Sequence, residues 1–215
     1  MIGKDSAIPT RREVEEKLSK VGDFVRMDYL SDCLKKNLDF DTRKFVLNTL
    51  AKIYEGRGIF LEAGRLMKAS ADINTTFEGK ISDFMKSAEL YVKAGSFDES
   101  DISFNKALAL ATQKQKEELK NKRKEIIKKQ AEDYAKKDKR KHAMDAYEKL
   151  ASLDLPLSEK KEVQKALLGL YEKLGKINDY YQVKRAMEAK LGNEMPKKPE
   201  KQRFMPENID DLIGL

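Results

Sequence analysis

Apolar and polar positions along the chain recur at helical spacing and are interrupted by short glycine turns. Residues 87–100, SAELYVKAGSFDES, combine the end of an amphipathic helix, a turn at Gly95 and the start of a second helix. Similar turns occur in SKVGDF at 19–24, EGRGIF at 55–60, VKAGSF at 92–97 and, more loosely, EKLGKI at 172–177. No proline lies between Pro9 and Pro156, and proline is strongly disfavoured inside helices. The pattern therefore predicts an all-helical chain built of helix-turn-helix hairpins.

Ten helices in five hairpins are expected. Their predicted ranges are 11–21, 23–37, 42–56, 59–73, 80–94, 97–112, 115–137, 139–152, 158–174 and 177–191. Each turn glycine is expected to adopt the left-handed conformation that ends a helix. The apolar residue two positions later is expected to enter the core, and these residues are Phe24, Phe60, Phe97 and Ile177. Two capping boxes are predicted at helix starts, Thr10 with Glu13 and Ser96 with Glu99.

A common register relates the hairpins. The residue four positions before each turn is large: Leu18, Tyr54, Tyr91, Tyr134 and Tyr171, with Asp138 in place of the glycine in the fourth copy. The successive intervals are 36, 37, 43 and 37 residues. Relative to Tyr54, Tyr91 and Tyr134, the positions three residues before and nine residues after hold small residues. The position thirteen residues after holds a bulky one. These residues are Ala51, Ala88 and Ala131; Ala63, Ser100 and Ala143; and Met67, Phe104 and Tyr147. Small side chains allow helices to cross closely, so the register predicts a repeat with a sorted core.

This register resembles the tetratricopeptide repeat, whose units are helical hairpins with small residues at the helix crossing. The resemblance covers residues 11–191 and implies an all-α, right-handed solenoid of stacked hairpins. The end copies depart from the pattern, with Leu18 and Met27 in the first and Leu168 and Tyr180 in the last. The long periods and AELYVKAGSF are also similar to the soluble attachment proteins that recruit a membrane-fusion ATPase. A helical bundle without repeats is the alternative.

In tetratricopeptide proteins the ligand commonly lies in a concave groove lined by the first helix of each hairpin. The resemblance implies that seven lysines line this groove: Lys52, Lys86, Lys93, Lys129, Lys136, Lys165 and Lys173. A basic groove of this kind is expected to bind an extended acidic peptide. The residues that clamp a terminal carboxylate in chaperone-binding members do not match, because Asn48 and Lys52 are reversed and Lys86 replaces an asparagine. Chaperone binding is therefore not expected.

The net charge of +7 is concentrated in residues 114–141, which hold 13 Lys and Arg against 6 Asp and Glu. The period is longest here, so a lengthened basic first helix is expected in the fourth hairpin. Its candidate binding residues, taken as mainly surface charges, are Lys122, Arg123, Lys124, Lys128 and Lys129. RNA, a ribosome, an acidic protein or an anionic membrane is a candidate partner. Lysine outnumbers arginine 34 to 10 and aromatic residues are scarce here, so a solvated lysine-rich face is the alternative.

The predicted domain organisation is a short N-terminal segment over 1–10, the repeat domain over 11–191 and a tail over 192–215. Pro196, Pro199 and Pro206 indicate a linker within the tail. The linker leads to an acidic amphipathic motif formed by Ile209, Asp210, Asp211, Leu212, Ile213 and Leu215. The motif is expected to anchor a foreign partner, or to dock on a groove containing Lys165 and Lys173 in its own or a neighbouring chain. Packing on the last hairpin is the alternative.

Nothing in the chain points to catalysis, a metal or a cofactor. Cys33 and His142 are the only residues of their kinds, and no phosphate-binding glycine loop occurs. Cys33 is expected to be a small buried hydrophobe. The chain has no apolar run of about 20 residues and no apolar stretch typical of a signal peptide at its start, so a cytoplasmic location is expected.

The function predicted from these features is that of a non-enzymatic scaffold or adaptor. Its partner is expected to bind the basic groove, the basic helix or both. Two other hypotheses stay open: an RNA- or ribosome-associated factor that uses the basic helix, and a regulatory subunit that docks by its C-terminal tail. Homo-oligomerisation is compatible with all three.

Overall fold

The computed structural model describes the backbone of residues 8–194 and the side chains of residues 8–188. This part of the chain contains ten α-helices and no strand. The helices are α1 (Arg11–Ser19), α2 (Asp23–Leu34), α3 (Phe40–Gly56), α4 (Phe60–Ile73), α5 (Phe77–Lys93), α6 (Phe97–Leu110), α7 (Gln113–Lys136), α8 (Arg140–Ala151), α9 (Leu157–Lys173) and α10 (Ile177–Glu194). Every predicted boundary lies within three residues of the observed one. The expected lengthened helix is α7, with 24 residues.

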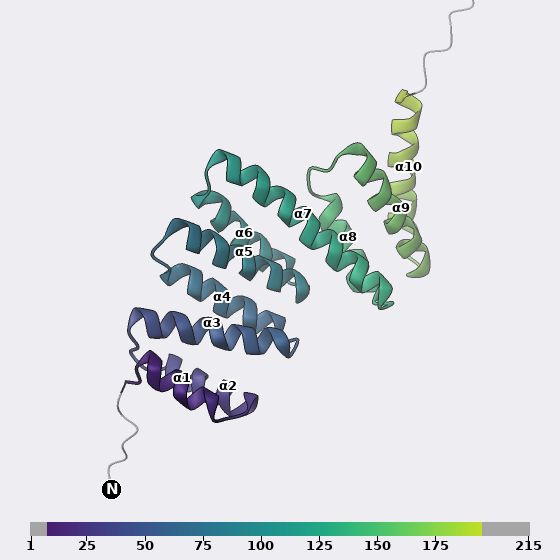
Figure 1. The fold of residues 1–215 in the computed structure, drawn as a ribbon. Helices are drawn as coiled ribbons and strands as arrows, with labels where there is room; N and C mark the ends of the chain where they lie inside the picture. Colours follow the sequence, from purple (N-terminus) through teal and green to yellow (C-terminus); the bar gives the residue numbers. More distant parts are fainter. Residues whose placement is uncertain (1–7, 195–215) are drawn as a thin grey trace, which may run out of the picture.

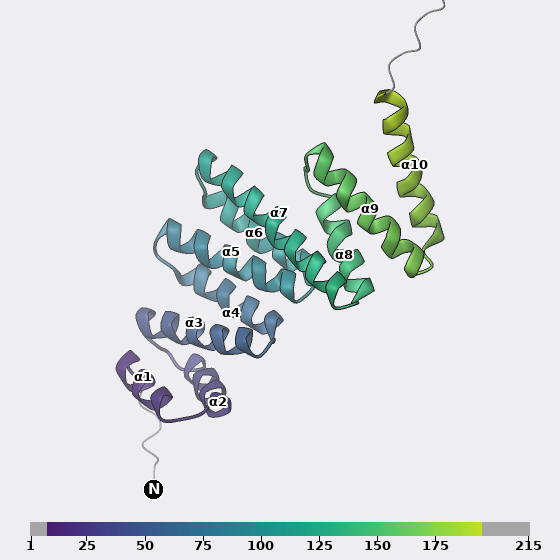
Figure 2. The ribbon, with the colours of Figure 1, turned by 45° about the vertical axis from the view of Figure 1, so that its right-hand side comes forward.

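The helices stack in chain order as hairpins and form an all-α solenoid (Figure 1). The fold predicted from the repeat register is confirmed at this level. Turning the molecule by 45° shows the same order of hairpins, with α10 at the C-terminal end of the stack (Figure 2). The buried core follows the stack, because three successive apolar clusters run from α1 to α10.

Four of the hairpin turns share one hydrogen-bonding pattern. Gly58, Gly95 and Gly175 have φ angles of 76°, 76° and 69°, and Asp138 has a φ of 53°. In each turn the amide that follows this residue donates to the carbonyl of the repeat tyrosine, at 2.8–2.9 Å, as in a Schellman motif. The left-handed prediction is wrong for Gly22, whose φ is −79°. Because α1 already ends at Ser19, Gly22 serves as the extended N-cap of α2.

The helix starts confirm one of the two predicted capping boxes. Thr10 and Glu13 form the box at the start of α1. The prediction is wrong for Ser96, whose side chain makes no cap hydrogen bond. Its backbone follows the left-handed Gly95 and its amide donates to Tyr91, while Glu99 pairs with Lys68 of α4 at 3.2 Å. The turn geometry therefore outweighs the capping signal.

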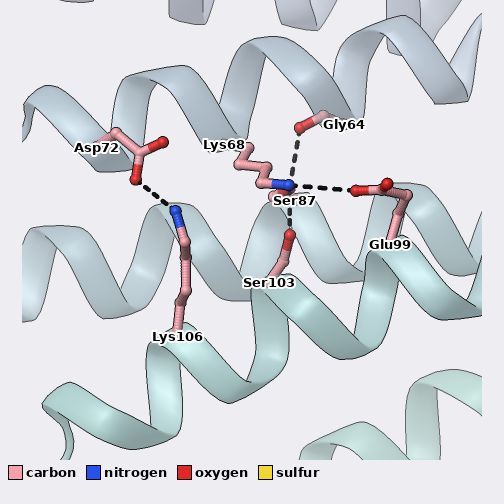
Figure 3. Close-up of polar contacts among 7 residues, drawn as sticks. All are labelled: Gly64, Lys68, Asp72, Ser87, Glu99, Ser103 and Lys106. Carbon is pink, nitrogen blue, oxygen red and sulfur yellow. Dashed lines mark hydrogen bonds and ion pairs between the residues drawn. The ribbon is translucent and has the colours of Figure 1, made fainter.

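The small residues of the register lie at helix crossings as predicted. All six are buried: Ala51, Ala63, Ala88, Ser100, Ala131 and Ala143. Figure 3 shows how polar groups are satisfied where α4, α5 and α6 meet. The Ser87 hydroxyl donates to the carbonyl of Gly64 at 2.9 Å and lies 3.1 Å from the Ser103 hydroxyl. These hydrogen bonds offset the desolvation cost of the two buried serines, whose small side chains allow the helices to pack closely.

The apolar residues that follow the turn glycines divide into two groups. Phe97 packs against the C-terminal core cluster, in line with the prediction, whereas Phe60 is only half-buried. The prediction is wrong for Phe24 and Ile177, which are 71% and 65% exposed. Ile177 belongs to the last hairpin, which no further hairpin follows in the described stack, whereas Phe24 follows Gly22, whose turn is not left-handed. The Arg57 guanidinium covers the Phe24 ring at 3.7 Å instead. Cys33 is buried, as expected.

Candidate partner-binding surface

The turns inside the hairpins lie along one edge of the stack (Figure 2). Ile59, Ser96 and Lys139 are the first residues after three of these turns and are the N-caps of α4, α6 and α8. Their backbones are nearly identical, with φ between −92° and −82° and ψ between 62° and 73°. Ile59 and Lys139 therefore hold equivalent places in the second and fourth hairpins.

A shallow depression lies on this edge, which we call the turn-edge trough. It is lined by the start of α4, the end of α5 and the α7–α8 turn, so it spans three consecutive hairpins. Its apolar lining residues are Ile59, Phe60, Leu61, Ala94 and Tyr134, and its basic lining residues are Lys93, Lys137, Lys139 and His142. Asp133 is the only acidic residue of the lining.

The floor of the trough is tied together by a hydrogen bond and a ring contact. The Tyr134 hydroxyl donates to the backbone carbonyl of Lys93 at 2.9 Å, which ties α7 to the end of α5. Burial raises the pKa of Tyr134, so the phenol stays protonated as a donor. The His142 ring lies 5.3 Å from the Tyr134 ring, and Ile59 presents 39% of its surface to solvent. An incoming apolar side chain would therefore meet a preformed surface.

The rim of the trough is positively charged. Lys137 pairs with Asp133 at 2.7 Å, and Lys139 is exposed at the N-cap of α8. The hydrogen bond from Lys137 holds the pKa of Asp133 below its ordinary value, and the charges of Lys136 and Lys129 add to this effect. Residues 136–141, KKDKRK, hold five Lys and Arg against Asp138 alone, so the α7–α8 turn carries an excess of positive charge.

The groove lysines inferred from the resemblance fall into two groups. Lys86 and Lys93 of α5 both contact Glu55 of α3 at 2.9 Å, and Lys93 also contacts Glu89 at 2.7 Å. These two lysines and two glutamates balance each other, so this stretch of the groove is not a basic surface. The other five are exposed: Lys52, Lys129, Lys136, Lys165 and Lys173.

The basic helix is less uniform than predicted. The prediction that Arg123 is a surface charge is wrong, because its side chain is only 17% exposed and pairs with Asp101 of α6. Its guanidinium also lies 4.5 Å from the centre of the Phe104 ring. Lys128 lies 3.7 Å from Glu162 and Lys124 is half-buried, whereas Lys122 and Lys129 are exposed. The predicted tail residues Ile209, Asp210, Asp211, Leu212, Ile213 and Leu215 lie outside the described residues.

Four functional candidates were missed by sequence reasoning, namely Ile59, Lys137, Lys139 and His142. A signal was available, because stacked hairpins place equivalent turns at one edge. EGRGIF and KKDKRKH occupy equivalent turns. A turn that ends in apolar residues and a basic turn are therefore expected at the same edge. Only the register of the stack, however, places residues 58–61 beside residues 130–142.

Neither a metal site nor a membrane span is evident in the described part of the chain. Among residues 8–188 no group of three His, Cys, Asp or Glu side chains is placed to hold a metal ion. No described helix has the length and apolar character needed to cross a bilayer. No protein-family model and no curated protein matches the chain.

Among solved structures, the chain is similar to one described as the crystal structure of BtubC (BKLC) from P. vanneervenii. The two share 12% sequence identity, and the match covers 91% of this chain and 84% of the other. The TM-score is 0.35.

Proposed function

We propose that the protein is a non-enzymatic adaptor of tetratricopeptide type that binds an acidic, partly apolar segment of a protein partner in the turn-edge trough. The observation that carries the proposal is the combination of a preformed apolar floor with a basic rim across three hairpins. Apolar side chains of the partner would rest against Ile59 and Phe60, and its carboxylates would face Lys137 and Lys139. Complementary charge adds specificity and accelerates association.

The electrostatic pairing favours a peptide partner over RNA. Arg123, the only arginine within the predicted basic cluster, is occupied by Asp101 and Phe104. The exposed cations that remain there are lysines, which lack the planar fork that pairs with phosphate in a bidentate manner. The trough, in contrast, offers apolar contact as well as charge, and that combination suits an acidic amphipathic segment.

The test is selection of binders from a random 12-residue peptide library displayed on phage, with the full-length protein as bait. We expect enrichment of peptides in which Asp or Glu flank Leu, Ile or Phe. Synthetic copies of the enriched peptides are then titrated against a trough variant, Lys137→Glu/Lys139→Glu. We expect at least a tenfold loss of affinity, because both rim charges are reversed.

A matched control carries the same change of charge at two positions of α7 that lie outside the trough. Lys114→Glu/Lys122→Glu alters two exposed lysines of α7 and is expected to change affinity by less than about threefold. A second variant, Ile59→Ser, removes apolar surface without altering charge and is expected to weaken binding as well. Equal losses in the trough and control variants, or selected peptides without acidic residues, would contradict the proposal. Tight binding of poly(U) RNA, abolished by Lys114→Glu/Lys122→Glu, would favour the RNA-associated alternative.

A further inference from the structure

We propose that the turn-edge trough is occupied by the C-terminal segment of its own chain, residues 207–215, ENIDDLIGL. This inference rests on the proposed function, since it names a ligand for the same site. It makes the trough a self-occluded surface from which a partner must displace the segment.

The charge and the apolar side chains of the segment complement those of the trough. Glu207, Asp210 and Asp211 provide three carboxylates and no residue of the segment is basic, although the whole chain has a net charge of +7. The apolar residues that would rest on the floor are Ile209, Leu212, Ile213 and Leu215. The segment thus combines acidic and apolar groups within nine residues, and the trough combines a basic rim with an apolar floor.

The position of α10 brings the segment within reach. The turn at Gly175 belongs to the same edge as the trough, so α10 starts at this edge and leads away from it (Figure 2). With 18 residues, α10 places Glu194 about 27 Å from the edge. The near wall of the trough is the start of α8, and α9 packs between α8 and α10. Helix spacings of about 8–10 Å therefore add roughly 18 Å of lateral separation.

The connecting chain is long enough to return. The two displacements combine to a distance of roughly 32 Å, whereas the residues from 195 to 206 extend to about 40 Å. A connection of this kind holds the segment at an effective concentration on the order of a millimolar. Even a contact that is weak between separate molecules would be populated within one chain.

The trough is a better docking place than the surface around Lys165 and Lys173 that the sequence suggested. Those two lysines are exposed on α9 and offer charge. The trough offers charge together with Ile59, Phe60 and the fixed ring of Tyr134. A segment with four apolar side chains gains from burying them only where an apolar surface is available.

Paramagnetic relaxation measured on the full chain tests this arrangement directly. Cys33 is 1% exposed, so a nitroxide attached to an Asn208→Cys variant would label the introduced thiol selectively. We expect strong broadening of the amide signals of residues 58–61 and 137–142 in isotope-labelled, spin-labelled protein. The same signals should stay sharp when isotope-labelled wild type is mixed with spin-labelled protein that carries no isotope. Broadening around Lys165 and Lys173 only, broadening only in the mixed sample, or no broadening would each overturn the proposal.

A charge exchange supplies the complementary test. Lys137→Glu/Lys139→Glu should abolish the broadening, and so should Asp210→Lys/Asp211→Lys. The two pairs combined should restore it. Met195→Asp/Gln202→Asp lowers the net charge by two, half the change made by the trough variant, but lies in the connecting residues and should leave the broadening intact. Failure of the combined variant to restore docking would exclude direct pairing of these charges.

Competition separates this inference from the proposed function. Acidic peptides obtained by the selection described above should bind about tenfold more tightly to the full-length variant Leu212→Asp/Ile213→Asp than to wild type, because the variant no longer blocks the trough. If these peptides bind the trough equally in both proteins, the proposed function stands and the self-occlusion is wrong. If no peptide binds the trough in either protein, both proposals fail.

Discussion

Gly58, Gly95, Gly175 and Asp138 hold the left-handed backbone that reverses the chain inside four of the hairpins. A residue with a Cβ atom pays about 1–2 kcal/mol for this conformation, and a short polar side chain tolerates it best. Asp138 fits that rule, and its carboxylate accepts a hydrogen bond from Nε of Arg140 at 2.8 Å. The fourth hairpin therefore closes without glycine.

The first prediction contrasts two glycines. We expect Gly95→Ala to lower the free energy of unfolding by about 1 kcal/mol, because the φ of 76° is retained by the surrounding turn. Gly169 lies within α9, has open space at its Cβ position and has no positive φ, so Gly169→Ala should raise the free energy of unfolding by about 0.5–1 kcal/mol. Urea denaturation monitored by circular dichroism measures both. Equal effects of the same sign would contradict the assigned turn geometry.

At the scale of helices, ion pairs connect neighbouring elements at different depths. Asp101 of α6 accepts from Arg123 of α7 and Lys149 of α8, and all three side chains are largely covered. Asp72 of α4 pairs with Lys106 of α6 at 2.9 Å in a much more exposed setting (Figure 3). Removing one partner of a covered pair leaves a poorly solvated charge, whereas an exposed pair contributes little.

The second prediction follows from this difference. Asp101→Asn should lower the free energy of unfolding by about 2 kcal/mol, because Arg123 and Lys149 would both lose their counter-charge. Asp72→Asn is the matched control and should cost less than about 1 kcal/mol. Chemical denaturation of both variants at neutral pH provides the comparison. A smaller loss for Asp101→Asn than for Asp72→Asn would show that the α6–α7–α8 contact does not support the stack.

The third prediction concerns acid and the contact between α3 and α5. Burial raises the pKa values of Glu55 and Glu89, but hydrogen bonds and charge from Lys86 and Lys93 outweigh it, and both pKa values lie below the ordinary value of 4.5. A carboxylate with a lowered pKa stabilises the fold above its unfolded-state pKa and loses this contribution as the pH falls through the folded-state pKa. Stability should therefore decline below about pH 4.5.

The variant Glu55→Gln/Glu89→Gln isolates this contribution. It cannot titrate at these positions, so its free energy of unfolding should fall less than that of wild type between pH 6 and pH 3. Urea unfolding at several pH values gives the two curves. Parallel curves would mean that the four charged side chains do not couple α3 to α5 in solution.

At the scale of the whole molecule, stability should vary along the stack. α5 packs on α4, α6 and α7 and buries seven residues, from Phe84 to Val92. α1 lies at one end and α10 packs on α9 at the other, so each lacks neighbours on one side. In a stack of hairpins each unit is stabilised mainly by its nearest neighbours.

The fourth prediction is a gradient of amide hydrogen exchange. Protection should be greatest in α5 and α6 and should decrease toward α1 and α10, because terminal hairpins open without disturbing the middle of the stack. Hydrogen exchange followed by mass spectrometry after proteolysis resolves these segments. Uniform protection from α1 to α10 would instead identify the stack as one cooperative unit.

The amino-acid sequence by itself determined the helices, most of their turns and the small residues at their crossings. These features depend on interactions between residues close in the chain: helical periodicity, left-handed glycines, and the tyrosine carbonyls that accept from amides five positions later. Local signals failed where two of them competed, as at Ser96, where the turn was not left-handed, as before Phe24, or where no hairpin followed, as at Ile177.

Only the tertiary structure decided which charges are free and where a binding surface forms. The sequence predicted Lys86 and Lys93 to be cations of the groove, but Glu55 of α3 lies beside them. It predicted Arg123 to be a surface charge, but Asp101 of α6 pairs with it. The turn-edge trough joins residues from three hairpins. The physical reason is that a charged side chain is paired or free according to its distance in space from other charges. The stacking of hairpins with unequal periods sets these distances, and spacing along the chain does not encode them.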